Sequence, residues 1–106
     1  MNPEEDVKEW LKKAKEDFDF AASTLPDTTF YAQICFHFQQ SAEKYLKAYI
    51  VGKKLEFRKI HELRKLLKIC EKDNTAFSQF RDECDFLSPF YIDTRYPVHW
   101  PAAVNK

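Results

Sequence analysis

The stretch YAQICFHFQQSAEKYLKAYIVG, residues Tyr31–Gly52, carries a long amphipathic pattern. Its apolar residues recur three and four positions apart, which places them on one stripe of an α-helix. The candidate N-caps before it are Asp27, Thr28 and Thr29. Gly52 ends the pattern, where a left-handed C-cap costs least. A helix of this length runs more than about 30 Å, so other helices must pack along it to bury the stripe.

Three further amphipathic segments flank this helix, at residues 7–25, 60–70 and 77–87. A proline follows the first and the last of them, at Pro26 and Pro89, and each proline stops a helix. The short link at Pro26 makes the first two helices antiparallel neighbours. No alternation typical of a strand lasts more than a few residues. The sequence therefore predicts an all-α fold, an antiparallel up-and-down four-helix bundle.

The composition is that of one small globular domain over residues 1–106. The chain holds 17 basic and 17 acidic residues, so global charge gives no attraction to nucleic acid, although a local patch stays open. No signal peptide and no apolar run long enough for a membrane span is present, which predicts a cytoplasmic protein. Residues 102–106 are compatible with the first turn of a truncated fifth helix.

Cysteine and aromatic residues give two further expectations. Three cysteines without a C-x-x-C pair are typical of buried thiols in a reducing compartment, and we predict neither a metal site nor a cofactor. Aromatic residues make up 16% of the chain, more than the interior of so small a bundle can hold. Surplus apolar surface usually marks an interface, which predicts a homodimer. The surplus rings are Phe30, Phe36, Phe57, Phe86 and Phe90.

Three segments resemble one known family in their order and spacing. They are FHFQQSAEKYLKAYIV (36–51), KIHELRKLL (59–67) and FYIDTRYP (90–97). The chain resembles the HEPN domain family, small prokaryotic helical proteins often encoded beside minimal nucleotidyltransferases. The resemblance implies a bundle of four or five helices that pairs as a homodimer. It also implies a nucleotide- or nucleic-acid-binding partner of a separately encoded nucleotidyltransferase, in a toxin–antitoxin-like pair.

The resemblance also implies an alternative, a metal-independent ribonuclease toxin. The nuclease branch of the family carries an Arg and a His with four to six residues between them, and the candidates here are Arg95 and His99, with three residues between. The His would move a proton at the RNA 2′-hydroxyl, and the Arg would stabilise charge on the phosphoryl group. The spacing here is one residue short, and Pro97 lies between the two. A ligand-free interaction module is a third alternative.

Four residues are candidates for binding nucleotide or phosphate: Arg95, Tyr96, His37 and Lys44. The resemblance supplies Arg95 and Tyr96, since some members take a nucleotide on a tyrosine near the Arg–His pair. His37 and Lys44 lie on one side of the predicted helix 31–52, two turns apart, where a phosphate could bridge them. Each candidate also has a structural alternative: an ion pair for Arg95, ring packing for Tyr96, and a solvated flank for His37 and Lys44. His61 is expected to bond to backbone or to a carboxylate.

Overall fold

The structure is a computed structural model that describes residues 3–56 and 59–91. Within these ranges the chain forms helices and no strand, which confirms the all-α bundle. The elements are α1 (Pro3–Thr24), the 3-10 turn η1 (Leu25–Asp27), α2 (Tyr31–Gly52), α3 (Leu63–Asp73), the 3-10 helix η2 (Thr75–Phe80) and α4 (Arg81–Leu87).

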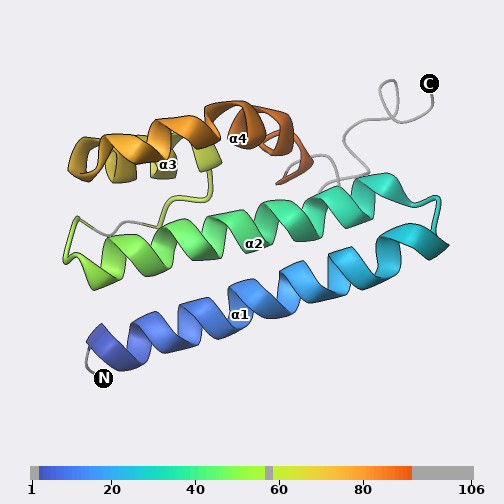
Figure 1. The fold of residues 1–106 in the computed structure, drawn as a ribbon, viewed down its shortest axis with the longest axis horizontal. Helices are drawn as coiled ribbons and strands as arrows, with labels where there is room; N and C mark the ends of the chain where they lie inside the picture. The colour runs from blue at the N-terminus through green and yellow to red at the C-terminus, as the bar shows by residue number, and fades with distance from the viewer. Residues whose placement is uncertain (1–2, 57–58, 92–106) are drawn as a thin grey trace.

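Helix α2 is the centre of the bundle, with α1 along one side and α3, η2 and α4 along the other (Figure 1). Helix α1 approaches α2 closely because its contact face carries Ala14 and Ala21, both fully buried. The Ser41 hydroxyl of α2 donates a hydrogen bond to the Ala14 carbonyl of α1 at 2.8 Å. Helix α2 therefore has packing partners on two of its faces.

The direction of α3 follows from contacts at its two ends. His61, just before α3, lies 2.8 Å from Glu43, whereas Asp73 at its end accepts a hydrogen bond from Tyr49. Helix α3 therefore runs the same way as α2, because the connector 53–62 first returns along α2 (Figure 1). The segment formed by η2 and α4 then runs back antiparallel to α3 and α2 (Figure 1).

The main core lies between α2 and the α3–α4 side. Helix α3 buries one strictly periodic stripe, which is the apolar pattern predicted for residues 60–70. Its residues pack with Leu46 and Ile50 of α2 and with Cys84 of α4. The stripe consists of Leu63, Leu66, Leu67 and Cys70.

The predicted caps of α2 are wrong in their details. Phe30 occupies the N-cap position without a side-chain hydrogen bond, and Thr28 instead accepts a bond from the Phe30 amide at 3.0 Å. The left-handed residue after the helix is Lys54, with φ 57°, rather than Gly52. A Cβ added at Gly52 would meet a Val7 methyl at 3.3 Å, so this glycine serves the close approach of α1.

Candidate functional site

Two of the candidate phosphate-binding residues meet at an acidic side chain. His37 Nδ1 lies 3.3 Å from one carboxylate oxygen of Asp17, and Lys44 Nζ lies 2.5 Å from the other. Asp17 comes from α1 and is mostly buried, with 17% of its side chain exposed. A carboxylate thus bridges His37 and Lys44, where a phosphate could also have done so, and it joins α1 to α2.

A second polar cluster is more deeply buried and surrounds Glu43 on α2. Glu43 is only 3% exposed, and its carboxylate accepts three hydrogen bonds. Gln39 Nε2 donates to Oε1 at 3.2 Å, and Lys47 Nζ and His61 Nδ1 donate to Oε2 at 2.8 Å each. Charge-assisted bonds of this kind satisfy a carboxylate that would otherwise be costly to bury. We call Glu43, Lys47 and His61 the Glu43 cluster.

Two aromatic rings enclose the Glu43 cluster. Lys47 Nζ, itself 4% exposed, lies 5.4 Å from the centroid of the Trp10 ring of α1, a cation–π contact. The His61 imidazole stacks on the Tyr91 ring, with centroids 5.6 Å apart and planes 7° from parallel. The side chain of His61 is 48% exposed, so the cluster is open to solvent only at this histidine.

The Glu43 cluster is the place where the three segments quoted above come together. Glu43 and Lys47 belong to segment 36–51, His61 to segment 59–67, and Tyr91 to segment 90–97. The predicted bond of His61 to a carboxylate is confirmed, with Glu43 as the partner. Glu43 itself was missed, although its spacing of four from both Gln39 and Lys47 was a signal for a helical hydrogen-bond ladder.

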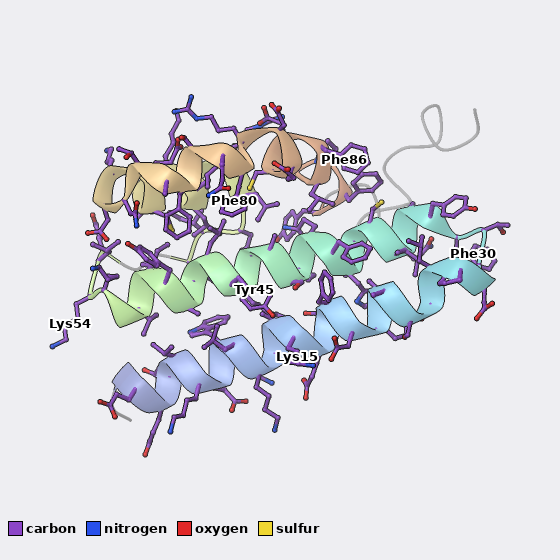
Figure 2. All side chains as sticks on the ribbon, viewed as in Figure 1. Lys15, Phe30, Tyr45, Lys54, Phe80 and Phe86 are labelled. Atoms are coloured by element: carbon purple, nitrogen blue, oxygen red, sulfur yellow. The ribbon has the colours of Figure 1, made fainter. Side chains whose placement is uncertain are left out.

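The opposite side of α2 carries an apolar trough between α1 and the η2–α4 segment. Its larger part has a volume of about 660 Å³ and its smaller part about 580 Å³. Tyr45 lies in both parts and is 43% exposed, and Phe80 and Phe86 border the trough on the other wall (Figure 2). Of the surplus rings, Phe86 is 64% and Phe30 is 70% exposed, and Phe57 lies outside the described residues.

The thiols are held in their neutral form. Burial raises the pKa of Cys70 to about 12 and that of Cys84 to about 11, and it also raises the pKa of Cys35. Thiolates are the nucleophilic form of cysteine, so these side chains act as small apolar groups. Within residues 3–56 and 59–91, no group of three or more His, Cys, Asp and Glu side chains is arranged to hold a metal ion.

The remaining candidates, Arg95, Tyr96 and His99, lie outside the described residues. The structure does reach Tyr91, four residues before Arg95 in the sequence. The described helices include none with the length and apolar character that a membrane crossing requires.

Fold and cluster together define an all-α protein whose characteristic segments build one buried ionic site. Comparison with protein families agrees, since the model of the HEPN domain matches residues 7–105. The chain belongs to the HEPN family. Comparisons with curated proteins and with solved structures give no match.

Proposed function

We propose that this HEPN-family protein is a homodimeric, cytoplasmic, single-domain partner of a separately encoded minimal nucleotidyltransferase, and that it binds a nucleotide or nucleic acid. The observation that carries the proposal is the convergence of the three segments at the Glu43 cluster. Four residues span at most about 14 Å, so the Cα atom of Arg95 lies within that distance of the Cα atom of Tyr91, whose ring stacks on His61. The permanent charge and forked donors of an arginine suit a phosphate group, which is why Arg95 is the proposed contact.

Nucleotide binding is tested by calorimetry with ATP and GTP on the full chain. We expect binding by the wild-type protein and its loss in Arg95→Ala. Arg81→Ala is the matched control, because Arg81 is an exposed arginine whose guanidinium pairs with Glu71. Equal binding by wild type and Arg95→Ala would remove Arg95 from the site, and no heat with either nucleotide would count against nucleotide binding altogether.

The homodimer is supported by the apolar trough. A contiguous apolar surface of this kind usually marks an interface, and a net charge of zero means that two copies do not repel each other. Light scattering should give the mass of two chains for the wild type and of one chain for Tyr45→Glu, which places a charge in the trough. Tyr31→Glu is the control, because Tyr31 is 58% exposed at the start of α2 and lines neither part of the trough.

The nucleotidyltransferase partnership, with its toxin–antitoxin character, is the part of the proposal that the family supports rather than the site. A minimal nucleotidyltransferase encoded next to this chain should co-purify with it when both are expressed together. If the adjacent reading frame encodes such an enzyme and the two proteins elute separately, the partnership is wrong. The same preparation tests Tyr96 as the acceptor of a nucleotide, since modification would add a nucleotide mass that Tyr96→Phe lacks.

One observation favours the ribonuclease alternative. His61 is open to solvent and stacks on Tyr91, which precedes Arg95 and His99 in the sequence. Cleavage of a labelled single-stranded RNA in the presence of a chelator, lost in both Arg95→Ala and His99→Ala, would establish the ribonuclease. Intact RNA after prolonged incubation with the wild-type protein would exclude the ribonuclease alternative.

A further inference from the structure

The bonds of His61 leave one of its ring nitrogens available. Nδ1 lies 2.8 Å from Glu43 Oε2 and 3.5 Å from Lys47 Nζ. The shorter contact, to a carboxylate, requires a proton on Nδ1, because a carboxylate only accepts hydrogen bonds. The neutral ring then carries its lone pair on Nε2, which bonds to no described residue.

The same contacts hold the ring in place. Glu43 fixes one edge of the imidazole and is itself held by Gln39 and Lys47. The Tyr91 ring covers one face of the imidazole, nearly parallel to it. A buried carboxylate that orients a histidine through Nδ1 is the arrangement that prepares Nε2 for proton transfer in catalytic triads. Here it directs a proton-accepting atom to the one solvent-open part of the Glu43 cluster.

We propose that His61 Nε2 binds a phosphate group of the ligand and takes up one proton from solvent as it does so. The neutral imidazole plus a proton gives an imidazolium, whose Nε2–H donates to a phosphate oxygen while Nδ1–H stays on Glu43. The inference rests on the proposed function for the existence of a phosphate-bearing ligand, and it names the atom that contacts it. Nucleotides and RNA share this phosphate chemistry.

The charges around the ring make the coupling to a proton necessary. Of the described residues, the ionisable groups that contact His61 are Glu43 and Lys47 of α2 and Tyr91 beyond α4. Glu43 and Lys47 neutralise each other, so the neutral histidine adds no charge for an anion to meet. A phosphate therefore gains a charged donor only when His61 becomes protonated, and binding by this route should strengthen as pH falls.

The first test reads the imidazole directly by ¹⁵N-detected NMR of the full chain, with the His61 signals assigned by their loss in His61→Gln. Free protein above neutral pH should show the Nδ1–H tautomer for His61, the less common form of a neutral histidine. Addition of ATP, and separately of a 12-nucleotide single-stranded RNA, should move both nitrogens to imidazolium shifts. An Nε2–H tautomer, or a ring that stays neutral in the presence of bound ligand, overturns the inference.

The second test is calorimetry in two buffers of different ionisation enthalpy. Wild type should take up a proton as it binds ligand above neutral pH, and His61→Gln should take up none and bind about tenfold more weakly. Lys15→Gln is the control, since Lys15 is exposed on α1 and pairs with Asp19 one turn away. Unchanged affinity in His61→Gln overturns the inference, as does a loss confined to His37→Gln, which would place the phosphate at the Asp17 position.

The two tests separate this inference from the proposed function. If the wild type binds neither ATP nor the RNA, the proposed function fails and the inference fails with it. If the wild type binds and Arg95→Ala does not, while His61→Gln binds normally, the proposed function stands and the inference alone is wrong. The titration that gives a binding heat, the one with ATP or the one with RNA, identifies the source of the phosphate.

Discussion

Replacing Glu43 by glutamine should destabilise the protein far more than a typical single substitution. Glu43 and Lys47 are 3% and 4% exposed, so the carboxylate and the ammonium neutralise each other away from water. Glutamine has the same shape but no charge, and its NH₂ group can only donate hydrogen bonds. Glu43→Gln therefore leaves the Lys47 charge buried and places donor against donor at Gln39 or at Lys47.

The magnitude follows from this buried charge. Removing one partner of a buried ion pair costs about 3–5 kcal/mol, against about 1 kcal/mol for an average substitution. Each kcal/mol lowers the melting temperature of a domain near this size by roughly 4–8 °C, so a loss of about 3–5 kcal/mol should lower Tm by roughly 12–40 °C. Lys47→Met should cost less, because it keeps the alkyl chain against Trp10 and leaves Glu43 bonded to the solvent-open His61.

The assay is urea unfolding followed by circular dichroism at a fixed protein concentration, because dimerisation would make apparent stability depend on concentration. The double variant Glu43→Gln/Lys47→Met closes a thermodynamic cycle. Its destabilisation should fall short of the sum of the single effects by more than about 1 kcal/mol, since each substitution removes the penalty left by the other. A loss below about 1 kcal/mol in Glu43→Gln, or strict additivity, would refute the assignment of a buried, coupled pair.

Three further outcomes are expected from the core. The folded-state pKa is about 11 for Cys84 and about 12 for Cys70 and Tyr49, above the ordinary 9.0 for cysteine and 10.0 for tyrosine. The free energy of unfolding that these three neutral groups contribute is therefore fully present below about pH 9 and is lost as pH rises through about 11 to 12. Urea unfolding measured across this pH range checks the expectation. Thiol titration of the native protein should label the half-buried Cys35 first and the other two only with unfolding, and rapid labelling of all three would contradict their burial. Leu66→Ala should cost about 2–5 kcal/mol in urea unfolding, because Leu66 is 1% exposed, and a cost under 1 kcal/mol would show that the site collapses freely.

The helices could be predicted because their signals are local. The third helix was recognised by an apolar stripe at helical spacing, and the prolines that stop α1 and α4 act on their immediate neighbours. The N-terminal part of the fourth segment forms the 3-10 helix η2, which Asn74 caps by accepting a hydrogen bond from the Ala76 amide at 3.0 Å. The direction of α3 depends on the connector 53–62, whose course is set by tertiary contacts.

The polar flank of α2 was the main feature that local patterns misjudged. Ser41 and Lys47 are polar residues of α2, yet they are 2% and 4% exposed. A helix with partners on two sides must bury two faces, and hydropathy identifies only the apolar one. The polar face can be buried because each of its groups has a partner, in Ala14, Glu43 and Trp10. The sequence predicted that His61 bonds to backbone or to a carboxylate, but it could not show that the carboxylate is Glu43, which lies 18 residues away in the chain.

The arrangement around α2 keeps the two proposed activities of this protein apart. At about 100° per residue, Glu43 and Tyr45 lie about 200° from each other around the helix axis. One side of α2 thus presents the apolar trough, and the other presents the Glu43 cluster with the ring of His61. A second chain seated in the trough would leave His61 uncovered, so the proposed dimerisation and the proposed phosphate binding would use different sides of α2. Tyr45→Glu and His61→Gln therefore probe separate functions, and each variant serves as the control for the other.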